Sequence, residues 1–595
     1  MQGVRAPPER TKVRALFLSL QHTDNTQALE NKKIIKQFKL AAELMELHDE
    51  NPFKIRSYAN AVAALELVEE PLETLTQAQL ESIQGVGKGI AAKILELNEK
   101  GTFAELDQML QVTPPGVVEM LSIKGIGPKK VRNLWKELGA ETVEELLEAC
   151  ELDKVSKLKG FGAKTQENIR QALLFTQQNR GKLLYAEAEL VAEQLLQRIK
   201  AAVPGAQVEL VGEMRRRMEI ITALQFILAT EAPARSHEAL QSIAELQEDQ
   251  KNSGPFAWRG ALTESGMPVE VRLVPTERFA NELLQTSSAP EHLAQLFTGS
   301  TNLLTVVREQ GYASEADIYK SAGMAYVAPE LREGTNELEL ALQNKLPKLL
   351  ELSDLKGILH NHSTYSDGAH TLEQMATYCR DMGYEYLGIS DHSKTAAYAG
   401  GLREGDVLRQ QKEIDELNKK LAPFKIFKGI ESDILGDGSL DYDEDILRTF
   451  DFIVASIHST LNMDEQKASA RLITAIENPY TTMLGHPTGR LLLRREGYPI
   501  NHKMVIDACA ANNVIIEINS NPWRLDLDWR YVHYALEKGV MLSINPDAHH
   551  TSGYDDMKYG VLVGRKGGLT KEMTFNAKPL EEVEKYFRER KEKIK

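Results

Sequence analysis

The sequence predicts a multidomain protein with an all-α N-terminal part, an α+β middle part and a C-terminal α/β barrel. Between residues 26 and 180, apolar residues recur every three or four positions between glycine-marked breaks, which indicates amphipathic helices. Between residues 183 and 345, short apolar strands are mixed with helices rich in Ala, Leu and Glu. From residue 355 onward, short apolar strands alternate with amphipathic helices. This repetition is typical of a distorted parallel barrel that carries its chemistry at the carboxyl ends of its strands.

The composition predicts several soluble globular domains. The chain has 595 residues, too many for one hydrophobic core, and is 42% apolar and 26% charged. No apolar run approaches the roughly 18 residues that cross a bilayer. Cys150, Cys379 and Cys509 are far apart and form no CxxC pair, so we expect no disulfides, no thiolate zinc site and a cytoplasmic location. Residues 1–25 contain only a short apolar stretch without a cleavage site, and we expect a flexible extension there.

Three of the glycine-marked breaks share the pattern apolar-x-Gly-apolar-Gly, followed by a lysine-bearing helix. Two glycines permit a tight turn whose backbone N–H groups lie at a helix N-terminus and face an anion, and the lysines add positive charge. The pattern predicts helix-hairpin-helix elements that grip a DNA backbone without reading bases, rather than turns that only join helices. The net charge of -15 argues weakly against this, because binding depends on where the cations lie. The predicted DNA contacts are Gly85, Gly87, Lys88, Gly125, Gly127, Lys129, Lys130, Gly160, Gly162 and Lys164.

The last part of the chain is rich in histidine and in carboxylates that follow its predicted strands. Imidazole and carboxylate groups at neighbouring strand ends converge in a barrel, and this mixture of ligands suits Mn, Zn or Fe. One such residue is more often structural, but nine after successive strands predict a metal site. They are His360, His362, Asp367, His392, Glu431, His458, His486, Asp547 and His549. We expect His370, His502 and His533 to be structural, and His550 stays ambiguous beside His549.

A site of this kind suits the hydrolysis of phosphate esters. Clustered divalent ions activate water and neutralise phosphate oxygens during in-line displacement. Arg490, shortly after His486, is the candidate for holding the substrate phosphate, with a solvated surface arginine as the alternative. Lys394 and Arg524 are weaker candidates.

This set of histidines and carboxylates resembles the polymerase-and-histidinol-phosphatase (PHP) domain family between residue 355 and about residue 570. All nine ligand positions of that family's trinuclear site are filled here. The resemblance implies three metal ions. It assigns His360, His362, Glu431 and Asp547 to one, Glu431, His458 and His486 to a second, and Asp367, His392 and His549 to the third.

From residue 26 onward the order of parts resembles bacterial family X DNA polymerases, and the linker 329–334 matches as well. The resemblance implies a Mn-dependent 3′→5′ exonuclease acting on gapped, nicked or 3′-ended DNA, and also allows an abasic-site endonuclease. We expect a monomer with no membrane partner. The implied domains are a helical domain (26–115), a fingers-like hairpin domain (116–180), a nucleotidyltransferase-like palm (181–275), a short thumb with linker (276–345) and the PHP domain (346–595).

The palm departs from the family pattern at its metal-binding positions. The family has Ser after Gly212 and an Asp-x-Asp pair further on; this chain has Glu213, then Ala223 and Gln225, and its third acidic position is Glu270. Two Mg²⁺ ions need carboxylate oxygens, which alanine and glutamine do not supply. We therefore expect no templated synthesis and a palm that only positions DNA. Its expected phosphate contacts are Arg215, Arg216 and Arg217; whether Glu219 and Glu270 rebuild a weak metal site stays open.

Lys93 aligns with a lysine that some family members use as a Schiff-base nucleophile in 5′-deoxyribose-phosphate removal. Such a lysine needs a lowered pKa, and we favour a backbone-contacting or solvated Lys93. For the whole chain, the alternatives to a DNA phosphodiesterase are a gap-filling polymerase with a PHP nuclease, a small-molecule phosphatase and a non-catalytic DNA-binding scaffold.

Overall fold

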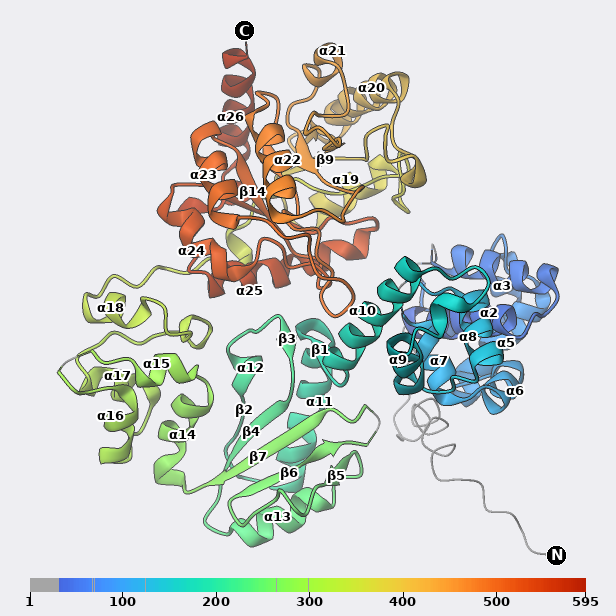
Figure 1. Ribbon diagram of the computed structural model, residues 1–595. Helices are drawn as coiled ribbons and strands as arrows, with labels where there is room; N and C mark the ends of the chain where they lie inside the picture. Colours follow the sequence, from blue (N-terminus) through green and yellow to red (C-terminus); the bar gives the residue numbers. More distant parts are fainter. Residues whose placement is uncertain are drawn as a thin grey trace, which may run out of the picture. The chain divides into compact units, whose positions relative to one another are not determined.

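The computed structural model describes residues 31–594 except 67, 69, 124, 264 and 298 (Figure 1). The extension predicted at residues 1–25 lies outside the described residues. The chain divides into two compact units, residues 1–180 with 263–266 and residues 181–262 with 267–595. None of the helices in the described part of the chain is both long and apolar enough to cross a membrane.

The first unit is helical between residues 31 and 180, as the sequence predicts. Capping boxes fix the starts of two helices, where Thr76 and Thr142 exchange hydrogen bonds with Gln79 and Glu145. A continuous apolar cluster forms the core of the unit. The helices are α2 (Asn31–Leu47), α3 (Pro52–Leu65), η2 (Leu72–Thr74), α4 (Gln77–Ser82), α5 (Lys88–Lys100), α6 (Ala104–Val112), α7 (Pro115–Leu121), α8 (Pro128–Leu138), α9 (Val143–Glu151), η3 (Val155–Lys157) and α10 (Ala163–Asn179).

The three glycine-marked breaks of this unit are tight turns that lead into helices α5, α8 and α10. The first glycine of each turn has a positive φ that side chains disfavour: 101° at Gly85, 88° at Gly125 and 86° at Gly160. The second glycine of each turn is the N-cap of the following helix. The third hairpin differs from the others because the short 3₁₀ turn η3 precedes it in place of an α-helix.

The second unit begins with a mixed sheet in the order β2-β4-β7-β6-β5. β4 and β7 are parallel in a register that sets Gln225 beside Glu270. The segment 220–228, which the sequence predicts as one strand, forms two strands. Thr222 donates hydrogen bonds to Glu213, and these bonds interrupt the strand after Ile221. The elements are β1 (Leu183–Leu184), α11 (Tyr185–Ala202), β2 (Val208–Val211), α12 (Gly212–Arg215), β3 (Ile220–Ile221), β4 (Leu224–Ala229), α13 (Pro233–Gln241), β5 (Leu246–Glu248), β6 (Ala257–Leu262) and β7 (Pro268–Val274). Strands β5 and β6 lack a regular apolar alternation and were not predicted.

A small helical region with its own apolar cluster follows the sheet. Within it, the fully buried His292 has Nδ1 2.6 Å from Glu337 and Nε2 2.8 Å from the Tyr319 hydroxyl. These contacts connect the segment around Glu337 to the preceding helices, which carry His292 and Tyr319. The elements are η4 (Thr276–Arg278), α14 (Phe279–Thr286), α15 (Pro290–Ala294), α16 (Leu303–Glu309), α17 (Glu315–Ser321), η5 (Pro329–Leu331) and α18 (Glu337–Leu342).

The last domain contains two parallel sheets, in the orders β10-β9-β8 and β11-β12-β13-β14-β15. The parallel bridges His392–Glu431 and Asn361–Ala548 join the two sheets. Every residue of β9, β12, β14 and β15 is buried, which explains why these strands are rich in apolar residues. The strands are β8 (Gly357–Ile358), β9 (Tyr386–Ile389), β10 (Lys425–Lys428), β11 (Glu431–Asp433), β12 (Val454–Ser456), β13 (Met483–Leu484), β14 (Ile515–Asn519) and β15 (Leu542–Asn545).

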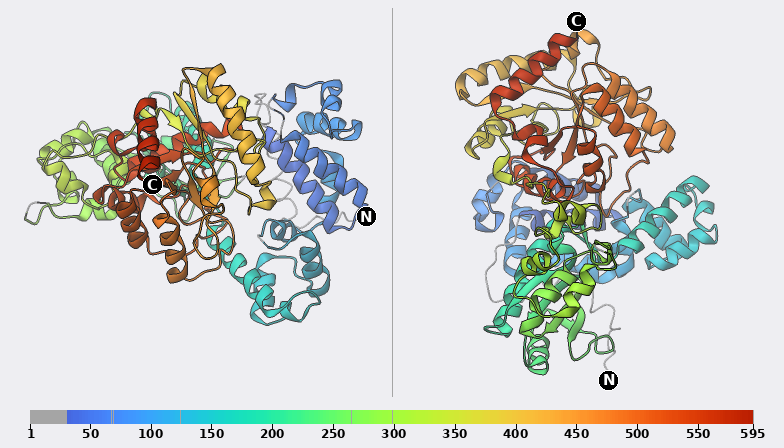
Figure 2. Two further views of the ribbon diagram at one scale, coloured as in Figure 1. Left: turned by 90° about the horizontal axis from the view of Figure 1, so that it is seen from above. Right: turned by 90° about the vertical axis from the view of Figure 1, so that its left-hand side faces the viewer.

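Helices surround these strands, as Figures 1 and 2 show. The predicted charged C-terminal helix is α26, whose Val583 and Phe587 pack on Phe427, Phe452 and neighbouring apolar side chains. The helices are η6 (Leu352–Asp354), α19 (Leu372–Asp381), η7 (Ala397–Ala399), α20 (Glu404–Leu421), α21 (Glu444–Leu447), α22 (Glu465–Glu477), α23 (His502–Asn512), α24 (Trp529–Glu537), η8 (Thr551–Asp556), α25 (Met557–Lys566), η9 (Lys571–Met573), η10 (Phe575–Ala577) and α26 (Leu580–Lys593).

We predict that acidification loosens the region around His292. Burial lowers the pKa of this histidine below its ordinary value, against the raising effect of Glu337. Below about pH 6.5 the unfolded chain therefore binds a proton that the folded chain does not, and stability falls as the pH drops. Hydrogen exchange of α17, corrected for intrinsic rates, should be faster at about pH 5.5 than at about pH 7.5. Equal protection at both pH values, or unchanged acid sensitivity in His292→Leu, would contradict this account.

Candidate metal centre

The nine predicted ligands all follow strands of the last domain. His360 and His362 come after β8, His392 after β9, and Asp547 after β15. Glu431 opens β11 directly after β10. His458, His486, His549 and Asp367 lie in loops that follow β12, β13, β15 and β8. Because the carboxyl ends of parallel strands meet at one edge, this placement gathers the side chains in one pocket.

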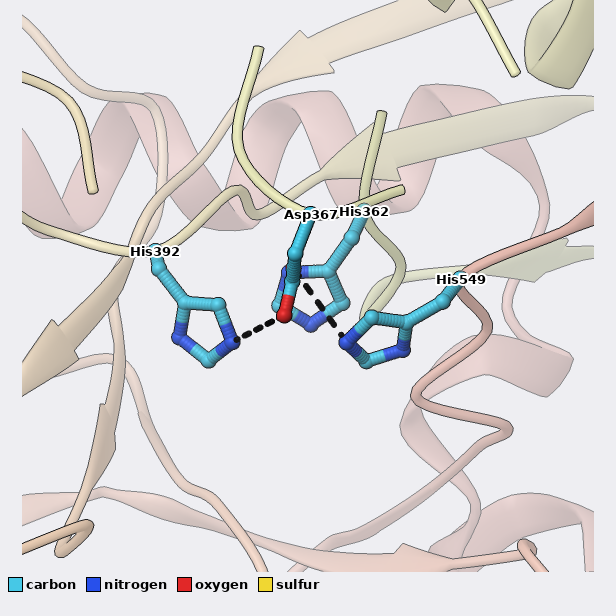
Figure 3. A group of neighbouring side chains, drawn as sticks. All are labelled: His362, Asp367, His392 and His549. Atoms are coloured by element: carbon cyan, nitrogen blue, oxygen red, sulfur yellow. Dashed lines mark ion pairs between the residues drawn. The ribbon is translucent and has the colours of Figure 1, made fainter. Parts of the chain in front are cut away.

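The structure brings the nine side chains together in overlapping groups. Ligand atoms within each group lie within 4.8 Å of one another, and the groups are His360, His362, Glu431 and Asp547; His362, Asp367, His392 and His549; and His392, Glu431 and His458. Figure 3 shows the second group, with three imidazole rings around Asp367. His486 joins the cluster through its Nε2, 2.9 Å from Glu431 Oε1.

Glu431 is the centre of this cluster. It is fully buried, and its carboxylate oxygens lie between 2.9 and 3.6 Å from five imidazole nitrogens, those of His360, His362, His392, His458 and His486. Burial raises the pKa of Glu431, but the surrounding histidines, His458 and His360 first, hold it well below its usual value. A shared carboxylate of this kind suits two neighbouring cations.

Buried polar atoms without partners show that the donor set fits divalent metal ions. His360 Nε2, His362 Nδ1, His486 Nδ1 and Glu431 Oε2 are buried and have no hydrogen-bond partner. Orphaned polar atoms are rare in protein interiors because each one costs free energy. Imidazole nitrogens and carboxylate oxygens at this density suit divalent metal ions.

Several buried carboxylates that orient the predicted ligands were not predicted. Glu517 lies 2.6 Å from His360 Nδ1, and Asp433 lies 2.5 Å from His458 Nδ1. Each fixes the ring orientation and leaves the other nitrogen, Nε2, facing the cluster. The available signal was a carboxylate inside an otherwise apolar buried strand, as with Glu517 in β14.

The three candidate phosphate-binding cations have different surroundings. The guanidinium of Arg490 donates to the carbonyl of Arg524 at 2.8 Å, to the carbonyl of Leu525 and to Asp528. A phosphate contact from Arg490 would require these bonds to break. Lys394 pairs with Glu404 at 2.9 Å. Arg524 reaches the cluster itself, with Nε 3.3 Å from Asp547 Oδ2.

In the predicted palm, Glu270 occupies the third acidic position of the family pattern, and neighbouring side chains of the protein compensate its charge. Arg259 donates to Glu270 Oε1 at 3.0 and 2.7 Å, and Gln225 donates to Oε2 at 3.1 Å. Burial raises the pKa of Glu270, but Arg272 and Arg259 bring it below its usual value. A side chain at Gly212 would clash with Gln225, so the glutamine fills the space beside this glycine.

Glu213 and the three arginines after it also have partners inside the protein. Glu213 accepts hydrogen bonds from Thr222. The other contacts are Arg215 with Glu315 at 2.7 Å, Arg216 with Glu333 at 2.8 Å and Arg217 with the Tyr185 hydroxyl. The DNA contacts predicted for Arg215 and Arg216 would require these ion pairs to open.

The hairpin lysines of the first unit lie on its surface. Lys88, Lys129, Lys130 and Lys164 are exposed, and an added side chain at Gly87, Gly127 or Gly162 would meet open space. Lys93 lies deeper in α5, with Nζ 3.4 Å from Glu105 Oε2 and 5.8 Å from the Tyr58 ring centre. Burial raises the pKa of Glu105, but hydrogen bonds from Lys54 and Tyr58 hold it below its usual value.

The fold and the site define a class of protein that joins helix-hairpin-helix domains to a PHP-type metal centre. Residues 29–103 match the helix-hairpin-helix domain family, residues 117–173 the SAM-like helix-hairpin-helix tandem and residues 359–521 the PHP domain. The chain is 35% identical over 576 residues to the DNA polymerase/3′-5′ exonuclease PolX of Bacillus subtilis (strain 168), covering 94% of this chain and 100% of that protein. The chain therefore belongs to the PolX family.

The last domain is also similar to shorter proteins. A probable phosphatase of Thermoanaerobacter sp. (strain X514) is 26% identical over 246 residues, which are 40% of this chain and 95% of that protein. A probable phosphatase of Acetivibrio thermocellus is 26% identical over 247 residues, 40% of this chain and 96% of that protein. The two helix-hairpin-helix families match other parts of the chain, residues 29–103 and 117–173.

We predict that Glu431→Gln removes more bound metal than Asp367→Asn. Glu431 belongs to two ligand groups and is fully buried, whereas Asp367 belongs to one and its side chain is 35% exposed. Loss of the shared carboxylate removes negative charge from two ion positions at once. Elemental analysis of the purified full-length variants measures the difference. Equal losses in the two variants would show that Glu431 is not shared.

Proposed function

We propose that this protein is a Mn²⁺-dependent DNA phosphodiesterase that removes nucleotides from 3′ ends and cuts at abasic sites. The observation that carries the proposal is the cluster of nine predicted ligands that has the fully buried Glu431 at its centre. The helix-hairpin-helix domains and the similarity to a named 3′-5′ exonuclease support DNA as the substrate. We further propose that the bridged sheets form a distorted closed barrel and that the cluster holds three ions, Mn or Zn with Fe as an alternative.

The residues around the cluster have distinct roles in this proposal. Divalent cations supply Lewis acidity at the phosphate and lower the pKa of water. Glu517 and Asp433 orient the rings of His360 and His458. Tyr398 is 74% exposed, and its ring centre lies 6.4 Å from that of His392, which places an aromatic face for a nucleobase beside the cluster.

We propose that the palm does not synthesise DNA. Alanine at position 223 offers no metal ligand, and the amide of Gln225 is neutral and already donates to Glu270. Arg259 and Arg272 supply the positive charge beside Glu270 that metal ions would otherwise supply. A guanidinium stays charged at physiological pH, so a cation would have to displace it against repulsion.

The alternatives make different predictions about substrates. A small-molecule phosphatase is favoured by the relatives that match 40% of this chain, but those matches leave the DNA-gripping hairpins without a role. A non-catalytic scaffold does not account for orphaned metal-ligating atoms in a buried pocket. For Lys93, the ion pair with Glu105 engages the amine that a Schiff-base nucleophile would need free, which favours a role in DNA phosphate binding.

We predict that a 5′-labelled primer on a gapped template becomes shorter, and not longer, with Mn²⁺ and all four deoxynucleotides. The ligand cluster provides for hydrolysis, and the palm lacks the carboxylates for extension. Gel analysis of the labelled strand measures both outcomes at once. His360→Ala should abolish shortening, because it removes a buried ligand from one group. The matched control is His533→Ala, a histidine of α24 outside the three groups.

Each other outcome of this experiment favours an alternative. A longer primer would show that the palm binds metal ions through other ligands. Shortening that survives His360→Ala would place the nuclease outside the cluster. An unchanged primer together with rapid hydrolysis of p-nitrophenyl phosphate would favour the small-molecule phosphatase. Binding without either reaction would favour the scaffold.

A further inference from the structure

A network of hydrogen bonds links the palm to the metal cluster within the second unit. It begins at Glu219, whose side chain is only 8% exposed. Two neighbouring residues of α24 donate to its carboxylate: Trp529 Nε1 at 3.0 Å and Arg530 Nη1 at 2.8 Å. A desolvated carboxylate that accepts from a guanidinium forms a strong and directional contact.

The network continues from Arg530 through Asp528 to Arg490. Arg530 Nη1 donates to both oxygens of Asp528, at 3.0 and 2.9 Å, and Arg490 Nη1 donates to Asp528 Oδ2. Two guanidiniums therefore share one carboxylate. Glu219 accepts from the same Nη1 of Arg530, so Asp528 is not the only carboxylate partner of Arg530 and also accepts from Arg490.

Arg490 in turn fixes the backbone that carries Arg524. It donates to the carbonyl oxygens of Arg524, at 2.8 Å, and of Leu525. The side chain of Arg524 reaches back to the cluster, with Nε 3.3 Å from Asp547 Oδ2. Asp547 is its only ion-pair partner among residues 31–594 where the structure describes them. Arg524 is thus a cation beside the predicted metal ligands. Its ion pair uses Nε, and its two terminal nitrogens form no ion pair with the described residues.

We propose that Arg524 binds the phosphate of the substrate and that the palm residue Glu219 positions it, through Arg530, Asp528 and Arg490. Glu219 is a positioning residue, because five contacts separate its carboxylate from Asp547 of the cluster. The palm thereby contributes to the PHP centre even without its own metal ligands. The inference rests on the proposed phosphodiesterase function and assigns a new role within it.

The physical reason is the precision that a phosphate contact requires. Displacement of a substrate-positioning group by about 1 Å can reduce a rate by about 100-fold. Without the charge of Glu219, Arg530 relies on Asp528 alone and competes with Arg490 for it. Arg490 then holds the carbonyl of Arg524 less firmly, and the guanidinium of Arg524 loses its place at the cluster.

A double-mutant cycle on the full-length protein tests the inference. The variants are Glu219→Gln, Arg524→Ala and the two combined, with Glu209→Gln on β2 as an exposed palm control. The substrate is the p-nitrophenyl ester of thymidine 5′-monophosphate with Mn²⁺, a diester small enough to need no DNA clamp. Glu219→Gln should lower kcat/KM by about 10- to 100-fold in the wild-type background and have no further effect once Arg524 is absent. Bound Mn²⁺ should stay unchanged, and the melting temperature should fall equally in Glu219→Gln and in the double variant, because the broken ion pair is nearly buried.

The outcomes separate this inference from the proposed function. If Glu219→Gln has no effect, or lowers kcat/KM equally with and without Arg524, the positioning role is wrong. If His360→Ala keeps full activity on the same diester, the proposed function fails instead. Should Glu219→Gln fold poorly, Arg530→Gln breaks the same contact from the PHP side and must reproduce the loss. Full activity in Arg530→Gln would overturn the inference as well.

Discussion

The buried carboxylate of Glu431 is the constraint on which the last domain depends. Five imidazole nitrogens lie within 3.6 Å of its oxygens, and Glu431 itself is fully buried. An ionised group at such a depth is stable only with compensating positive charge. Histidines can supply that charge by protonation or can hold cations in its place. The loops after the parallel strands place the ligands around Glu431, and Glu517 and Asp433 orient two of the imidazole rings.

The predicted palm surrounds its buried carboxylate with different groups from those of the last domain. Glu270 is also partly buried and negatively charged, but its partners are Arg259, Arg272 and Gln225. An imidazole nitrogen has a lone pair that a metal ion can use, whereas a guanidinium has only donors and keeps its charge. Carboxylates among histidines make a site for cations, and a carboxylate among arginines makes a structural contact.

Much of the fold and the cluster could be predicted from the sequence, because local signals carry them. Paired glycines mark the hairpins at Gly85 and Gly125, and the ligands follow apolar strands, so both stand out along the chain. Strands β5 and β6 could not be predicted because they lack regular alternation. The partners of the arginines were also hidden. Glu315 lies 100 residues from Arg215, and only the tertiary structure shows that such a pair forms. The contacts of Arg490 with Arg524, Leu525 and Asp528 were hidden in the same way.

The central claim is that the protein binds its catalytic cations in the last domain and not in the palm. Anomalous diffraction near the manganese absorption edge, from crystals of the full-length protein grown with Mn²⁺, tests this claim most directly. The account predicts strong anomalous peaks among the side chains that surround Glu431 and no peak beside Gln225 and Glu270. A peak between Gln225 and Glu270, or a cluster around Glu431 without any peak, would contradict it.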